Sequence, residues 1–143
     1  MDLMYAECPQ ETGGTIPPDF LEHNRELGEE YPQTFRKAVQ AGVKMSFGTD
    51  LGICPYGSSP KQFALMVKYG MTPMQAIQAA TSNAADLLGH SSEIGSIKPG
   101  KYADLVAVSG DPLTNISVLE NVEFVMKEGK AYKQSGKSAC SQE

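Results

Sequence analysis

The spacing of apolar side chains, together with the glycines and prolines between them, predicts several helices and one strand in the first ninety residues. Residues 20–30 are rich in Glu, which predicts a solvated helix. A second helix is expected from Pro32 to Gly42, because glycine readily adopts the left-handed conformation that ends helices. Residues 43–48 then alternate apolar with small or polar side chains, which is the pattern of a strand.

Two strong helix starts follow this strand. Ser59 precedes a proline and is followed three residues later by a glutamine, which predicts a helix that ends at Gly70. The same signal recurs at Thr72, with Gln75 as the residue that completes a capping box. Apolar residues then recur at helical spacing, and Gly89 is the expected end of one continuous helix.

The pattern changes after Gly89, where turn residues and short apolar runs predict a small β unit. One strand is expected over residues 103–108 and another over residues 121–126. Glu128 and Gly129 then turn the chain into a hairpin with residues 130–132. Residues 135–143 are polar and are expected to form a disordered tail.

Strand and helix therefore alternate before the small β unit begins, which is typical of the last part of an α/β barrel. A whole barrel of this kind needs about 250 residues. The chain has 143 residues, so it can supply only part of one.

Composition and charge exclude several partners. The formal net charge is −5 and the basic residues are scattered, whereas a nucleic-acid surface needs them concentrated on one face. The sequence has no apolar run of about 18 residues, so a membrane span is not expected. Its three cysteines lie far apart and form no Cys-x-x-Cys pair. This argues against a disulfide framework or a structural zinc site and favours a reducing, cytoplasmic setting.

Asp50 is the first candidate for chemistry, because it follows the expected strand of residues 43–48. Catalytic groups of α/β barrels collect at the carboxyl ends of the strands. A carboxylate there can remove a proton from an attacking water and later protonate a leaving amine. Position alone, however, fits an ordinary loop or capping aspartate better.

Several motifs in a fixed order resemble the amidohydrolase superfamily, in particular its Xaa-Pro dipeptidase-like and imidazolonepropionase-like enzymes. The resemblance runs from about Tyr31 to Tyr132. It rests on Phe-Gly-Thr-Asp at 47–50, Gly-Met-Thr-Pro-Met-Gln-Ala at 70–76, Ala-Ala-Thr-Ser-Asn-Ala-Ala at 79–85, Leu-Leu-Gly at 87–89 and Ile-Gly-Ser-Ile-Lys-Pro-Gly-Lys-Tyr-Ala-Asp-Leu-Val at 94–106. Each motif is weak by itself, but together they are specific.

The resemblance implies an α/β fold: the C-terminal fragment of a metal-dependent (β/α)8 barrel with part of a small β-sandwich. Residues 1–90 would be the last βα units, and residues 91–134 would be sandwich strands that pair with the N-terminal end of the full enzyme. Asp50 would end the eighth barrel strand, bind or neighbour a divalent metal such as zinc, and transfer a proton. Asp104 would be a structural residue of the sandwich.

The remaining metal ligands of this family are not found in the chain. The family uses a His-x-His pair, a lysine or glutamate and two further histidines, and a catalytic zinc generally needs three protein ligands. His23 and His90 match none of these positions. His23 is expected on a solvated helix surface, and His90 just beyond a helix end, whose negative dipole it can approach. Tyr56 stands where relatives often have a histidine, so it is either a substrate-binding residue or an exposed loop aromatic. Cys54 has no histidine positioned to activate it as a nucleophile.

Two functions remain open. The first is a metal-dependent amidohydrolase that cleaves an amide or peptide-like C–N bond in a small-molecule or dipeptide-like substrate. This chain would then be a truncated form, inactive without its missing N-terminal barrel half, and a homo-oligomer is possible. The alternative is a non-catalytic remnant that acts as a binding or structural module. A nucleotide-binding module is disfavoured, because no Gly-rich fingerprint leads into a helix near Gly48 and Gly52.

Overall fold

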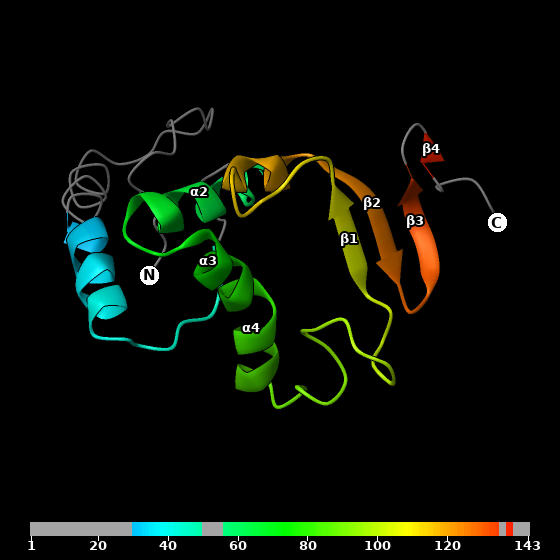
Figure 1. Cartoon of the computed structure of the whole chain (residues 1–143), viewed down its shortest axis with the longest axis horizontal. Coiled ribbons are helices and arrows are strands. Elements are labelled where there is room, and N and C mark those ends of the chain that lie inside the picture. Colours follow the sequence, from blue (N-terminus) through cyan, green and yellow to red (C-terminus); the bar gives the residue numbers. More distant parts are fainter. Residues whose placement is uncertain (1–29, 50–55, 135–136, 139–143) are drawn as a thin grey trace, which may run out of the picture.

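In the computed structural model, residues 30–49, 56–134 and 137–138 are described. A group of helices is followed by an antiparallel sheet (Figure 1). The helices cover residues 30–40, Tyr56–Ser58 (η2, a 3₁₀ turn), Lys61–Lys68 (α2), Pro73–Ala80 (α3) and Ser82–Leu87 (α4). The sheet contains Leu105–Val108 (β1), Val122–Lys127 (β2), Lys130–Gln134 (β3) and Lys137–Ser138 (β4), and a 3₁₀ helix, Ile116–Glu120 (η3), connects β1 to β2.

The three helix ends expected at glycines are confirmed. Gly42, Gly70 and Gly89 have φ angles of 69°, 119° and 74°. Each glycine N–H donates to the carbonyl three residues back, and the next N–H donates to the carbonyl five residues back, as Val43 does to Ala38 at 3.0 Å. These paired bonds satisfy carbonyls that the end of a helix leaves unpaired.

The helix starts differ from each other. At α3 the capping box is complete: the Gln75 N–H donates to Thr72 Oγ1 at 3.2 Å, and the Thr72 N–H donates to Gln75 Oε1 at 2.8 Å. At α2 the expected Ser59 cap is wrong. The helix begins one residue later, with Pro60 at the N-cap and no side-chain cap.

The single helix expected up to Gly89 is interrupted at Thr81, which has φ −125° and ψ −90° and separates α3 from α4. Its hydroxyl donates to the Ile77 carbonyl at 2.7 Å, a back-bond that competes with regular helix geometry. Gly95 packs directly against this junction. A Cβ on Gly95 would lie 2.5 Å from Ala85 Cβ and 2.9 Å from the Thr81 carbonyl oxygen.

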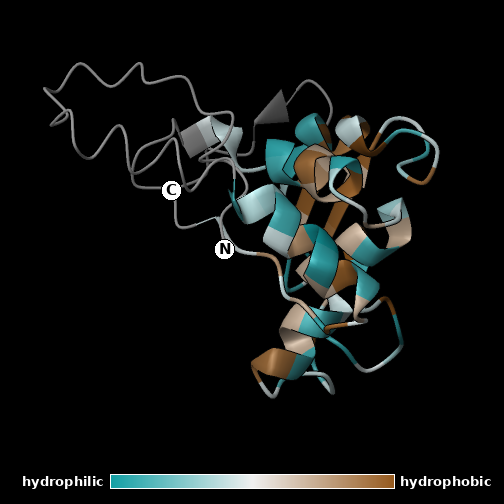
Figure 2. Ribbon diagram, turned by 90° about the vertical axis from the view of Figure 1, so that its left-hand side faces the viewer, coloured by the Kyte–Doolittle hydropathy of each residue, from teal (hydrophilic) through white to brown (hydrophobic). Residues whose placement is uncertain are grey.

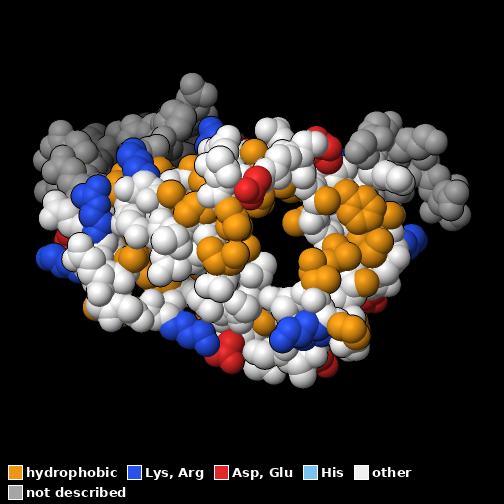
Figure 3. Space-filling model, in the orientation of Figure 1, with side chains coloured by type: hydrophobic (Ala, Val, Ile, Leu, Met, Phe, Trp, Pro, Cys, Tyr) orange, Lys and Arg blue, Asp and Glu red, His pale blue; other side chains and the backbone are white. Residues whose placement is uncertain are grey.

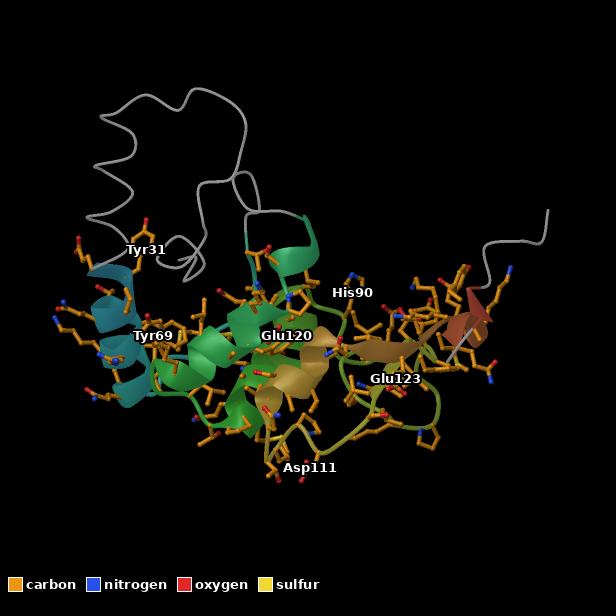
Figure 4. All side chains as sticks on the ribbon, turned by 90° about the horizontal axis from the view of Figure 1, so that it is seen from above. Tyr31, Tyr69, His90, Asp111, Glu120 and Glu123 are labelled. Carbon is orange, nitrogen blue, oxygen red and sulfur yellow. The ribbon has the colours of Figure 1, made fainter. Side chains whose placement is uncertain are left out.

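The main core lies among the helix of residues 30–40, α2 and α3. Tyr69, at the end of α2, lies beside the helix of residues 30–40, with the Arg36 guanidinium 5.2 Å from its ring centroid (Figure 4). Figure 2 shows that the helices carry both hydrophilic and hydrophobic residues, as amphipathic helices packed on one side do. The buried cluster consists of Phe35, Leu65, Met66, Tyr69, Met71, Ala76 and Ala79.

The strand expected over residues 43–48 is not formed. Residues 43–49 belong to neither helix nor strand and connect the first described helix to the rest (Figure 1). A strand requires a hydrogen-bonded neighbour, and the described residues provide no such ladder beside this segment. The alternating pattern was therefore insufficient to predict a strand in this chain.

The small β unit is confirmed. Its strands follow the order β1-β2-β3-β4, and all neighbours are antiparallel. Glu128 and Gly129 connect β2 to β3 with φ angles of 50° and 78°, which matches a tight hairpin turn that needs positive φ at both positions. Residues 137–138, which were expected in the disordered tail, form β4. The rest of that tail lies outside the described residues.

Candidate active site

The segment that leads to Asp50 is held by α3 and α4. The Phe47 N–H donates to the carbonyl of Ala79 in α3 at 2.9 Å. The side-chain amide of Asn83 in α4 donates to the Met45 carbonyl at 3.1 Å. Two backbone groups of the segment therefore have fixed partners, although no sheet is formed.

An exposed ion pair joins the start of the same segment to α4. The Lys44 ammonium contacts the Asp86 carboxylate, and both side chains are about 60 % exposed. The hydrogen bond and the charge of Lys44 lower the pKa of Asp86 below its ordinary value. Solvent screens such an exposed pair, so it contributes little to stability.

Helix α2 contacts the end of the segment through two consecutive side chains. The Phe63 ring stacks on the Phe47 ring with centroids 4.6 Å apart. The neighbouring Gln62 directs its Nε2 toward the Gly48 carbonyl oxygen at 3.5 Å. Thr49 is the last described residue before Asp50, and it is half-buried.

The predicted site residues themselves are not brought together among the described residues. Asp50, Cys54 and His23 lie outside the residues that the structure describes. Tyr56 begins η2, but the orientation of its side chain is not described. The roles of Asp50 and Tyr56 therefore stay predictions.

His90 is at the surface, where its Nδ1 lies 2.7 Å from a carboxylate oxygen of Glu93. The acidic residues labelled in Figure 4 do not converge on it. Within residues 30–49, 56–134 and 137–138, no three His, Cys, Asp or Glu side chains form a group that could hold a metal ion. The described residues alone therefore do not fit a catalytic metal site, which generally requires three protein ligands.

Asp104, which was expected to be a structural residue, contacts the β2–β3 turn. Its carboxylate accepts hydrogen bonds from Lys127 Nζ and from the Glu128 backbone N–H, each at 2.8 Å. These two hydrogen bonds lower the pKa of Asp104. The same contact with Asp104 raises the pKa of Lys127. The carboxylate thus ties the start of β1 to the β2–β3 turn.

Gln62 was missed as a candidate. Sequence reasoning assigned it to the first turn of a helix, where its side chain would cap the backbone. Instead it is 3 % exposed, with Nε2 on the Gly48 carbonyl. The only signal in the sequence was a polar residue beside Phe63 on an otherwise apolar helix face. Such residues are too common to identify a site.

An apolar hollow lies between the helices and the sheet (Figure 3). Its volume is about 690 Å³. One side is formed by α3, α4 and the residue after them, and the other by β1. Its lining includes Ile77, Ala84, Leu88, Leu105, Val106 and Val108. Since these side chains are too apolar to favour water, the hollow has the character of a packing surface.

None of the helices in the described ranges is both long enough and apolar enough to cross a membrane.

The described residues form a group of helices followed by an antiparallel sheet, and comparison with known proteins identifies the family. The model of the Amidohydrolase family matches residues 21–132. The chain therefore belongs to the amidohydrolase family, and the resemblance inferred from its motifs is confirmed. Enzymes of this family generally use divalent metals.

The relatives are much longer than this chain. Imidazolonepropionase of Porphyromonas gingivalis is 46 % identical over 101 residues, which cover 66 % of this chain and 24 % of the relative. Ochratoxinase of Aspergillus niger is 34 % identical over 115 residues, covering 77 % and 24 %. The solved structure of a Xaa-Pro dipeptidase with bound methionine has a TM-score of 0.82 and 43 % identity, covering 91 % and 32 %. The chain thus spans about a quarter of the curated relatives and a third of this structure.

Proposed function

We propose that this chain is the C-terminal part of a metal-dependent hydrolase that cleaves an amide or peptide-like C–N bond, with Asp50 as its catalytic carboxylate. The supporting observation is the anchored segment of residues 44–49. Hydrogen bonds from α4, α3 and α2 reach its backbone at Met45, Phe47 and Gly48, and the Phe63 ring of α2 stacks on Phe47. A group that transfers protons needs such a fixed attachment, because its distance to the reacting atoms determines its effect.

The chemistry assigned to Asp50 is proton transfer in two directions. As a carboxylate it removes a proton from the water that attacks the carbonyl carbon. It then delivers a proton to the nitrogen that leaves. The divalent metal, which we propose to be zinc, requires ligands beyond Asp50. The described residues do not provide them, so we assign them to the N-terminal part of the full-length enzyme.

The similarity to the amidohydrolase family supports an assignment of the two parts of the chain. We assign residues 1–90 to the last βα units of a (β/α)8 barrel and residues 91–134 to strands of a small β-sandwich. The apolar hollow and the free edge of β1 would contact the missing N-terminal part. The similarity to a Xaa-Pro dipeptidase favours a small, dipeptide-like substrate, with Tyr56 as a residue that contacts it. A cytoplasmic setting and a homo-oligomer stay predictions.

The test uses an enzyme of full family length that carries this chain as its C-terminal part. Asp50→Asn should lower kcat by roughly 10²- to 10⁴-fold, because asparagine has the same shape but cannot exchange the proton. Asp104→Asn is the matched control and should keep turnover, since Asp104 contacts the hairpin. Dipeptide hydrolysis, followed by release of the free amino acid, measures both variants.

Two results would count against the proposal. Full activity of Asp50→Asn would show that Asp50 is an ordinary loop residue. A complete enzyme that hydrolyses neither dipeptides nor other amides would instead favour the non-catalytic remnant. The 143-residue chain alone should show no hydrolysis under the same conditions.

A further inference from the structure

Gln62 is the one buried polar or charged side chain within the described residues, at 3 % exposed. It lies in α2 next to Leu65 and Met66, which belong to the main core. Its Oε1 is buried and has no hydrogen-bond partner among the described residues. More than about 90 % of buried polar groups in proteins have a partner. An unpaired amide oxygen inside a helix core therefore requires an explanation.

The other end of the same amide has a specific target. Nε2 points at the Gly48 carbonyl at 3.5 Å, a long hydrogen bond. The next residue of α2, Phe63, stacks on Phe47. Two consecutive residues of the helix thus contact two consecutive residues of the segment that ends before Asp50. A methionine would fill the same volume as Gln62 without any polar atom to satisfy.

We propose that Gln62 is a positioning residue for the backbone that leads into Asp50. Its Nε2 holds the Gly48 carbonyl, and its Oε1 accepts a hydrogen bond from an N–H or O–H group that lies outside the described residues. The amide thereby connects this second contact to the backbone that leads into Asp50. This inference rests on the proposed function.

The free oxygen supports this second contact in physical terms. A buried acceptor without a donor is unfavourable, because water satisfied it in the unfolded chain. The long bond to Gly48 also leaves the amide free to adjust. A donor that approaches Oε1 would fix the plane of the amide and with it the Gly48 carbonyl.

The experiment compares three variants in the full-length enzyme. Gln62→Met keeps the volume and removes both polar contacts. Gln62→Glu replaces the donor with a carboxylate, which repels the Gly48 carbonyl when ionised but can donate to it when protonated. Gln78→Met, at an exposed position in α3, is the matched control. The measurements are kcat and KM over a range of pH, and hydrogen exchange of the Phe47 amide, which is bonded to Ala79.

For Gln62→Met we expect kcat to fall on the order of tenfold to a hundredfold, with KM changed by less than about twofold. The Phe47 amide should exchange on the order of tenfold faster. For Gln62→Glu the deficit in kcat should shrink as pH is lowered and the buried carboxyl, whose pKa burial raises, takes up a proton. Gln78→Met should behave like the parent enzyme.

The outcomes separate this inference from the proposed function. Full kcat in Gln62→Met, while Asp50→Asn is inactive, would overturn the role of Gln62 and leave the function intact. Full activity of Asp50→Asn would overturn the function. In that case unchanged exchange of the Phe47 amide in Gln62→Met would overturn the positioning role as well. If Gln62→Met does not fold, the pH dependence of Gln62→Glu decides, and a deficit that is constant with pH refutes the inference.

Discussion

Replacement of Gly95 by alanine tests the close contact between the loop after α4 and the α3–α4 junction. Two costs are expected. The first is backbone strain, because Gly95 has a φ of 82°, which L-residues rarely adopt. The second is overlap, because the new Cβ would lie 2.5 Å from Ala85 Cβ and 2.9 Å from the Thr81 carbonyl oxygen.

The size of each cost follows from the geometry. Left-handed backbone costs an L-residue about 1–2 kcal/mol. Overpacking that forces neighbouring atoms to shift costs about 1–3 kcal/mol. Ala85 is 2 % exposed and the Thr81 oxygen belongs to the backbone, so neither can move away as a flexible side chain would. Gly95→Ala should therefore lower the free energy of unfolding by about 2–5 kcal/mol.

Gly100→Ala is the matched control. Gly100 belongs to the same loop and has a φ of 86°, but nothing lies within 4 Å of the position that its Cβ would take. It should show the strain alone, about 1–2 kcal/mol. Urea denaturation followed by circular dichroism measures both variants. The difference between the two losses in unfolding free energy gives the cost of the overlap alone. For a chain of about this size, each kcal/mol of that cost should lower Tm by about 2–4 °C.

A second substitution makes the test sharper. Ala85→Gly removes the methyl group nearest to the new Cβ. The double variant should therefore recover part of the unfolding free energy that Gly95→Ala loses. The cost of a glycine in a helix, about 1 kcal/mol, is subtracted first. Equal losses in Gly95→Ala and Gly100→Ala, or strictly additive effects with Ala85→Gly, would refute the close packing of this loop.

Three further outcomes are expected. Thr72→Ala should lower the free energy of unfolding by about 1 kcal/mol in urea, because the Gln75 N–H loses its cap, and Thr72→Ser should not. The pKa of Asp104 is lowered in the folded chain from its ordinary value of 3.8. The ionised carboxylate therefore stabilises the fold at pH values above 3.8, and this stabilisation is lost as the pH falls through the lowered pKa of the folded chain. Melting temperatures should therefore drop on acidification, and less so in Asp104→Asn; equal profiles would contradict this. The isolated chain should self-associate in sedimentation runs, and Val106→Lys on the exposed edge strand β1 should reduce this more than Val43→Lys does.

Local signals in the sequence predicted three helix ends and one helix start. The ends at Gly42, Gly70 and Gly89 and the capping box at Thr72 involve only residues within about five positions, so their geometry is determined wherever the helix lies. The hairpin at Glu128 and Gly129 was predictable for the same reason. Ser59 was the exception, because the chain enters α2 through a tighter turn at Pro60.

Features that depend on distant contacts were missed. The strand over residues 43–48 needs neighbouring strands, and no local pattern reveals whether they are present. The interruption at Thr81 accompanies the approach of Gly95, fourteen residues later. The candidate site shows the same division. Motifs identified the family and made Asp50 a candidate, whose role stays a prediction. The contact between Gln62 and Gly48 depends on how α2 packs on the segment, which no local pattern indicates.

The segment of residues 44–48 is attached to the helices in a way that a barrel strand in a complete sheet would not require. In a sheet, backbone groups of neighbouring strands supply the partners of each carbonyl. Here side-chain amides supply them, from Asn83 to Met45 and from Gln62 to Gly48. Because these amides belong to α4 and α2, the helices hold the segment without a neighbouring strand among the described residues. Under the proposed function, the backbone up to Gly48 is thus held by this chain's own helices, and the remaining groups of the catalytic site lie outside the described residues.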